Sequence, residues 1–468
     1  MSDQFFKQKS KKQRGFIIPT AAAMFMTAIP VTGLAIDVSI MYMVQSRLQA
    51  AVDAGALAGA RSLARGNNSS AQVASAQAAA QAYLTANFPT GYLGTSALSV
   101  PVPVVDVTQP NIRFVTVNAS VNVAHVFLRW FGGTLTTVRA GATATRRDVN
   151  VAIVMDRSGS LANSGSCTPL KAAAIAFSDK FAEGRDNVGL ITFASSSRVD
   201  FALANTFKTS NPSVASTINS VTCTGATNSA QGLWQGYQSL AALNQPAALN
   251  VILFFTDGEP TAVTADFAIK ATSGCADKTT KTGVFTVTGN PPTATYGLLK
   301  WDAPVQPMTS DITVAANSTG CSYVSNFNNV GNDVTGVPVT DHWGNNLNNG
   351  YLPVTLTTGM LAANSNATNA QNFQNASVNA ADNAAARIRV AALPGNGAAS
   401  LPNVVIFSIG LGGSGAASDD FLRRVANDPG SSSFSTTAAT GLYVYAPTVA
   451  DLGNAFNRVA SEILRLAK

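Results

Sequence analysis

Three short polar segments of this 468-residue chain carry side chains that could bind a metal ion. Residues 156–160, with the sequence DRSGS, follow an apolar run at 149–155, and residues 256–258, with the sequence TDG, follow a second apolar run. A polar segment between them, residues 225–228, contains one more hydroxyl. Two carboxylates and three hydroxyls suit a hard divalent cation, with Mg²⁺ favoured over Mn²⁺ or Ca²⁺. The candidate ligands are Asp156, Ser158, Ser160, Thr227 and Asp257.

The elements around these residues predict how they come together. We expect strands at residues 149–155, 188–193, 250–256, 404–409 and 441–445, with helical stretches between them and a last helix at 449–466. Strands that alternate with helices predict a mostly parallel, doubly wound α/β sheet covered on both faces. Ligand sites in such sheets form at the carboxyl ends of the strands, where Asp156 and Asp257 stand.

A long insertion interrupts this predicted sheet. Residues 261–375 are rich in Asn, Thr, Gly and Ser, and they contain Cys275 and Cys321. Structureless loops of more than about 15 residues are uncommon in compact domains. We therefore expect an inserted subdomain, stapled by its two cysteines, between the two parts of the sheet domain at 148–260 and 376–468.

The N-terminus is typical of a membrane anchor. Five of the first 14 residues are Lys or Arg, and residues 15–36 contain no charge. The apolar segment is long enough to span a bilayer, and the positive-inside rule places residues 1–14 in the cytoplasm. A cleaved secretory signal is the alternative, although its apolar core is usually shorter. Residues 37–147 then predict a helical stem, a second helix at 71–86 and a small sheet rich in Val and Thr.

Charge and cysteine content exclude several classes of site. The net charge of +6 falls to +2 without residues 1–14, which hold five of the 30 basic and one of the 24 acidic residues. A nearly neutral body argues against nucleic-acid binding. Two histidines and no C-x-x-C spacing argue against a zinc site. In an exported chain, four cysteines favour disulfides, with three pairings open: Cys167, Cys223, Cys275 and Cys321.

The metal-binding segments resemble the von Willebrand factor A (VWA) family and its metal-ion-dependent adhesion site. The matching residues are D-x-S-x-S at 156–160, Thr227 and T-D-G at 256–258, and the resemblance covers about residues 150–260 and 376–466. It implies that the three hydroxyls bind metal directly and that the two carboxylates bind it directly or through water. In this fold Cys167 and Cys223 would both lie near the metal edge, so we expect a disulfide between them, with two small buried residues as the alternative.

The N-terminal part resembles the TadG-type proteins of the bacterial Tad/Flp pilus-assembly system. The matching segments are Arg14-Gly15, GLAID at 33–37, RLQAAVDAGALAGA at 47–60 and FLRWFG at 127–132, and the resemblance covers roughly residues 14–146. It implies a single-pass protein of the bacterial inner membrane, with its bulk in the periplasm or at the cell surface. Pilin-like relatives have a Glu where this chain has Thr20, which favours an uncleaved anchor or assembly factor over a major pilin.

These observations favour a binding protein over an enzyme. The leading expectation is pilus assembly or surface adhesion, in which the metal site binds an acidic group on a pilus or envelope protein. A structural scaffold whose metal only stabilises the fold is the first alternative. A metal-dependent hydrolase is the second, but no G-x-S-x-G or H-E-x-x-H motif is present and both histidines lie outside the matched segments.

Overall fold

The chain divides into two compact units, and each is described by itself. The structure is a computed structural model, and it describes residues 17–63, 65, 69–109, 111–272, 279–289, 291–298, 335–357, 360, 366–390, 401, 403–413 and 416–467. The N-terminal unit comprises residues 1–62, 74–105 and 114–144. The C-terminal unit comprises residues 63–73, 106–113 and 145–468.

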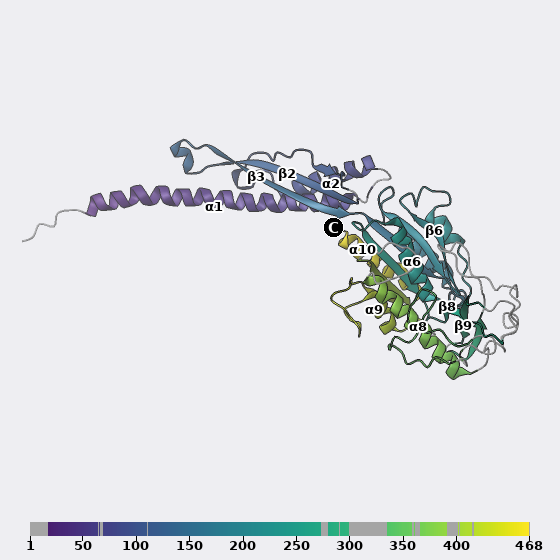
Figure 1. Cartoon of the computed structure of the whole chain (residues 1–468). Helices are drawn as coiled ribbons and strands as arrows, with labels where there is room; N and C mark the ends of the chain where they lie inside the picture. The colour runs from purple at the N-terminus through teal and green to yellow at the C-terminus, as the bar shows by residue number, and fades with distance from the viewer. Residues whose placement is uncertain are drawn as a thin grey trace, which may run out of the picture. The chain divides into compact units, whose positions relative to one another are not determined.

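The N-terminal unit is built on one long helix, α1 (Ile17–Ser62), which Figure 1 shows as a continuous rod. Among the described helices, α1 alone is long and apolar enough to cross a membrane. The second helix, α2 (Ser69–Asn87), packs on its C-terminal part, where a Cβ atom at Gly59 would lie 3.2 Å from Cβ of Ala80. Residues 17–36 of the predicted apolar segment and the helical stem after them form one uninterrupted helix.

A three-stranded sheet completes the N-terminal unit. Its strands, in spatial order, are β1 (Val104–Asp106), β2 (Ile112–Ala124) and β3 (Leu135–Arg147), with the short helices η1 (Tyr92–Gly94) and η2 (Leu128–Phe131) in the connections. Every second residue of β2 from Val115 to Val123 is buried. This period of two is expected for a strand that packs one face against a core.

The C-terminal unit contains a six-stranded sheet with the order β12-β11-β7-β4-β5-β6. The strands β12, β11, β7, β4 and β5 pair in parallel, and β6 pairs antiparallel to β5 at the edge. The predicted doubly wound sheet is confirmed, with one edge strand that the sequence did not predict. The bounds are β4 (Val149–Asp156), β5 (Asn187–Phe193), β6 (Ser197–Ala204), β7 (Leu249–Thr256), β11 (Val405–Leu411) and β12 (Tyr443–Ala446).

Helices cover both faces of this sheet, and β4 contributes alternate residues to two cores. Val151 and Ile153 belong to one core, and Ala152 and Val154 belong to the other. The first core includes residues of α4 (Cys167–Ser178), α5 (Val214–Ser220) and α10 (Leu452–Leu466), which follows η6 (Val449–Asp451). The second includes residues of α6 (Ser229–Leu243), α8 (Ala367–Arg389) and α9 (Asp419–Ala426).

A smaller sheet lies in the segment between β7 and α8. Its order is β10-β9-β8, from β8 (Ala262–Phe267), β9 (Lys281–Thr288) and β10 (Ala294–Leu298). The ring of Phe285 lies 4.5 Å from that of Phe373 in α8, so this sheet packs on the larger one through a covering helix. Cys275 and Cys321, which we expect to pair, lie outside the described residues.

Two glycines allow α6 to approach the large sheet closely. A Cβ atom at Gly236 would lie 2.6 Å from Cγ2 of Val154, and one at Gly232 would lie 2.8 Å from the ring of Phe193.

We expect Gly236→Leu to lower the free energy of unfolding by about 1 to 3 kcal/mol, because the new side chain must displace the helix. Ala242→Leu, at an exposed position of α6, is the matched control. Urea unfolding followed by circular dichroism compares them, and equal stabilities would contradict this close packing.

Candidate metal centre

The first loop of the candidate site begins where β4 ends. Asp156, the last residue of β4, is fully buried, and its Oδ1 accepts a hydrogen bond from the backbone N–H of Ser158 at 2.7 Å. A carboxylate that binds the N–H two residues later stabilises a tight turn. This turn leads into the short helix α3 (Gly159–Asn163) and leaves Ser160 exposed.

The second loop begins at the end of β7, directly beside the first. Met155 of β4 pairs with Phe255 of β7, so both strands end at the same edge of the sheet. The hydroxyl of Ser160 donates to Oδ1 of Asp257 at 2.7 Å, and the Ser158 hydroxyl lies 3.5 Å from the same oxygen. The Ser158 and Ser160 hydroxyls lie 2.9 Å apart. Both carboxylates and two of the three hydroxyls therefore lie together at this edge.

Thr256 links the two strand ends, a role that the sequence did not predict. Its hydroxyl donates to Oδ2 of Asp156 at 2.6 Å and accepts from the backbone N–H of Gly258 at 3.2 Å. Thr256 therefore orients the buried carboxylate and shapes the turn that carries Asp257. The only signal for it was its place as the first residue of the T-D-G segment.

The third loop carries Thr227, and backbone hydrogen bonds fix it to both other loops. The N–H of Gly159 donates to the carbonyl of Gly225 at 2.9 Å, and the N–H of Thr261 donates to the carbonyl of Thr227 at 2.9 Å. Asn228 then caps the N-terminus of α6, because its side chain accepts from the N–H of Gln231. Thr227 is 5% exposed, and its hydroxyl has no hydrogen-bond partner among the described residues.

A disulfide ties the first loop to the third. Cys167, the first residue of α4, is bonded to Cys223, and their Cα atoms lie 6.2 Å apart. The pairing expected from the sequence is therefore present. Next to it, the N–H of Thr224 donates to the carbonyl of Arg157 at 2.7 Å, so a backbone contact reinforces the covalent one.

Two acidic groups at this edge disfavour each other's charge. Burial raises the pKa of Asp156, and the nearby Asp257 raises it further. Burial also raises the pKa of Asp257. A carboxylate beside a second carboxylate costs free energy to ionise, and a divalent cation between them reverses this effect.

The donor set fits a hard cation. Within the part of the chain that the structure describes, no group of three or more His, Cys, Asp or Glu side chains could hold a metal ion. The candidate centre instead combines two carboxylates with three hydroxyls, all of them oxygen donors. Such a set matches Mg²⁺, which is bound in proteins through one or two carboxylates and keeps some of its water.

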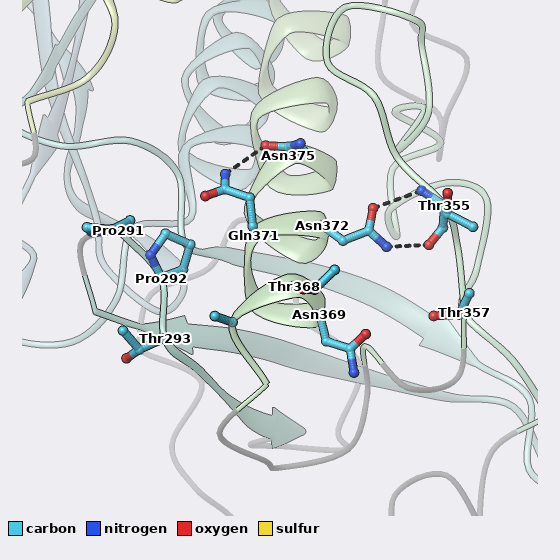
Figure 2. A pocket seen from close by; sticks show the side chains of 11 residues that line it. Pro291, Pro292, Thr293, Thr355, Thr357, Thr368, Asn369, Gln371, Asn372 and Asn375 are labelled. Carbon is cyan, nitrogen blue, oxygen red and sulfur yellow. Dashed lines mark hydrogen bonds between the residues drawn. The ribbon is translucent and has the colours of Figure 1, made fainter.

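A separate cavity of about 710 Å³ lies between the β9–β10 connection and the N-terminal part of α8. Thr, Asn and Gln side chains line it together with Pro291, Pro292 and Ala367, and it includes none of the five candidate ligands. Figure 2 shows Asn372 directed at Thr355 and Gln371 directed at Asn375, the second pair joined at 3.0 Å. These amide groups are already hydrogen-bonded within the protein.

Two family models match separate segments of the chain. Residues 15–62 match the putative Flp pilus-assembly TadE/G-like family, and residues 151–259 match the von Willebrand factor type A domain. The combination of these two matches corresponds to a TadG-type Tad pilus protein with a VWA domain. All five candidate ligands fall within the VWA match. The TadE/G-like match and the apolar helix α1 fit membrane anchoring, and the two matches support a pilus-associated VWA protein.

Solved structures similar to this chain include VWA domains and pilus proteins. The PilB minor pilin from Streptococcus sanguinis is 13% identical, over 81% of this chain and 81% of that chain, with a TM-score of 0.36. The vWF domain of the type V pili tip protein Mfa5 from Porphyromonas gingivalis is 14% identical, over 69% and 98%, with a TM-score of 0.38. The von Willebrand factor type A from Catenulispora acidiphila is 12% identical, over 78% and 52%, with a TM-score of 0.34. No curated protein matches the chain by sequence.

We expect Mg²⁺ to raise the thermal unfolding midpoint of the wild-type protein and to leave that of Asp257→Asn unchanged. A cation at about 100 times its dissociation constant stabilises a folded protein by about 2.7 kcal/mol. In EDTA, Asp257→Asn should be at least as stable as the wild type at neutral pH. The reason is that the nearby Asp257 helps to raise the pKa of Asp156 in the folded protein. An acid with a raised pKa destabilises the folded protein as the pH rises above the usual carboxyl pKa, and Asp257→Asn removes part of this effect.

Differential scanning fluorimetry in EDTA and in excess Mg²⁺ measures both effects. Asp179→Asn, which removes the same charge from an exposed position at the far end of α4, is the matched control and should keep the wild-type shift. An equal Mg²⁺ shift in Asp257→Asn would show that the cation binds elsewhere.

The disulfide should contribute strongly to stability. It closes a loop with a sequence separation of 56 residues, for which the chain-entropy relation gives about 4 kcal/mol, with a usual range of about 2 to 4 kcal/mol. We expect the double variant Cys167→Ala/Cys223→Ala to lose about that much, measured by urea unfolding. Dithiothreitol should lower the urea midpoint of the wild type much more than that of the double variant. If dithiothreitol lowers both midpoints equally, this disulfide contributes little to stability.

Proposed function

We propose that the C-terminal unit is a metal-dependent adhesion domain that binds an acidic group on another pilus or envelope protein. The observation that carries the proposal is the convergence of Asp156, Ser158, Ser160 and Asp257 within hydrogen-bonding distance at one strand edge. The Thr227 hydroxyl, which has no partner in the described part of the chain, would add the fifth donor. Burial raises the pKa of both neighbouring carboxyls, and a cation bound between them would favour their charged forms.

Each residue has a distinct part in this proposal. Ser158, Ser160 and Thr227 would hold Mg²⁺ through their hydroxyls, and Asp156 and Asp257 would hold it directly or through water. When bound, the cation supplies an open coordination position for a carboxylate from the partner. Thr256 keeps Asp156 in place, and the Cys167–Cys223 disulfide keeps the first and third loops together. Ser160 is exposed, so the partner's acidic group would reach the cation from its side.

The proposed activity is binding and not catalysis. Hydrolysis at a bound cation is commonly assisted by a general base within reach of the attacking water. The two histidines have other contacts, since His125 bonds to Thr136 at 2.9 Å and His342 bonds to Asp266 at 2.8 Å. Neither contact involves a candidate ligand. We therefore assign no acid-base role to either histidine.

We also propose that α1 crosses the bacterial inner membrane once, with the basic residues 1–14 in the cytoplasm. The uncharged segment 15–36 would span about 33 Å as a helix, which matches the hydrocarbon thickness of a bilayer. The positive charges before it set the orientation. The C-terminal unit would then lie in the periplasm or at the surface, where Cys167 and Cys223 can remain oxidised.

Partner capture tests the proposed binding. Full-length protein in detergent, immobilised and incubated with envelope extract, should retain a pilus or envelope protein in Mg²⁺ and release it in EDTA. Asp257→Asn should retain none, whereas Asp179→Asn should behave as the wild type. A partner retained equally in EDTA and by Asp257→Asn would favour the structural scaffold, in which the cation only stabilises the fold.

A further inference from the structure

The turn between β2 and β3 presents a cluster of exposed apolar side chains. Trp130 is 77% exposed, Phe131 is 71% exposed and Leu135 is 59% exposed. The guanidinium of Arg129 lies 5.7 Å from the centre of the Trp130 ring. We call these four residues the hairpin tip. Large aromatic side chains so exposed to water are unfavourable unless another apolar phase covers them.

The structure fixes the position of this turn along α1. Asp37 of α1 is 2% exposed, and its carboxylate accepts hydrogen bonds from the backbone N–H groups of Val126, Phe127 and Leu128 at 2.8, 3.0 and 2.8 Å. One turn earlier, a Cβ atom at Gly33 would lie 2.6 Å from Cγ of Phe127. The missing side chain at Gly33 therefore lets the turn lie directly against the helix.

This position coincides with the end of the uncharged segment. Residues 15–36 carry no charge, and Asp37 is the first charged residue after them. Figure 1 shows the β2–β3 hairpin lying alongside α1, with its turn toward the N-terminal half of the helix. If α1 spans a bilayer with residues 15–36, the hairpin tip lies at the level where hydrocarbon meets lipid headgroups.

The chemistry of the hairpin tip fits that level. Trp is enriched at membrane interfaces because its ring is apolar and its N–H is polar. Arg can keep its charged end among headgroups while its carbon chain lies against apolar surface. Phe and Leu gain by entering the acyl region.

We infer that the hairpin tip inserts into the headgroup region of the membrane that α1 crosses and forms a second contact of the N-terminal unit with lipid. The inference rests on the proposed crossing by α1. Two points of contact would hold the N-terminal unit at a fixed height and rotation about α1, because a single helix can turn freely in a bilayer whereas a helix with a docked hairpin cannot. The occupant is the lipid headgroup layer itself, not a protein.

Site-specific photocrosslinking in the full-length protein tests this. A photoreactive phenylalanine derivative replaces Phe131, and the protein is reconstituted in vesicles of phosphatidylethanolamine and phosphatidylglycerol. Irradiation should give a lipid adduct on the tip peptide, detected by mass spectrometry. The same probe at Tyr83, 57% exposed in α2, is the matched control. Since α2 contacts α1 at Gly55, Tyr83 lies about 27 Å beyond Asp37 and should give at least tenfold less adduct.

A probe at Met26, 80% exposed within the uncharged segment, separates this inference from the proposed anchoring. A lipid adduct at Met26 with none at Phe131 would overturn the inference and leave the membrane crossing intact. No adduct at either position would overturn both. An adduct between Phe131 and a second copy of the chain, in place of lipid, would identify a protein contact and overturn the inference as well.

Discussion

The in-register parallel pairing of β4 with β7 is the constraint on which the candidate site depends. It ends both strands at one edge, so Asp156 and Asp257 become neighbours although 100 residues separate them in sequence. The hydroxyl of Thr256 then bonds to Asp156 across the pair. The Thr227 loop and the disulfide attach to this edge. A shift of one residue in this pairing would separate the two carboxylates and remove the site.

Two buried aspartates of this chain show how differently a carboxylate can be satisfied. Asp37 accepts hydrogen bonds from three backbone N–H groups. These bonds satisfy its carboxylate and join α1 to the turn between β2 and β3. Asp156 accepts from one backbone N–H and from the Thr256 hydroxyl, and it lies close to a second acid. Hydroxyls can rotate to offer a lone pair to a cation instead of a proton to a carboxylate. This freedom of the hydroxyls suits the site around Asp156 to a metal ion. The fixed backbone donors around Asp37 suit that carboxylate to a structural role.

The sequence predicted the strands that carry the site because β4 and β7 are buried throughout and read as continuous apolar runs. It also predicted which polar residues end these strands, and the Cys167–Cys223 pairing followed from the resemblance to a known fold. Strand β6 was not predicted, because its residues are mostly half exposed and include the ion pair of Arg198 with Asp200. The role of Thr256 depends on the register of two distant strands, which local sequence does not specify. Occupancy by metal remains a prediction.

Anomalous diffraction from crystals of the protein grown with Mn²⁺ would show directly whether the site binds a metal ion, since Mn²⁺ accepts the same oxygen ligands as Mg²⁺ and scatters anomalously. We expect one strong peak within coordination distance of the Ser158, Ser160 and Thr227 hydroxyls, and we expect it to be absent from crystals of Asp257→Asn. A fully ordered site with no peak, or a peak that persists in Asp257→Asn, would contradict it.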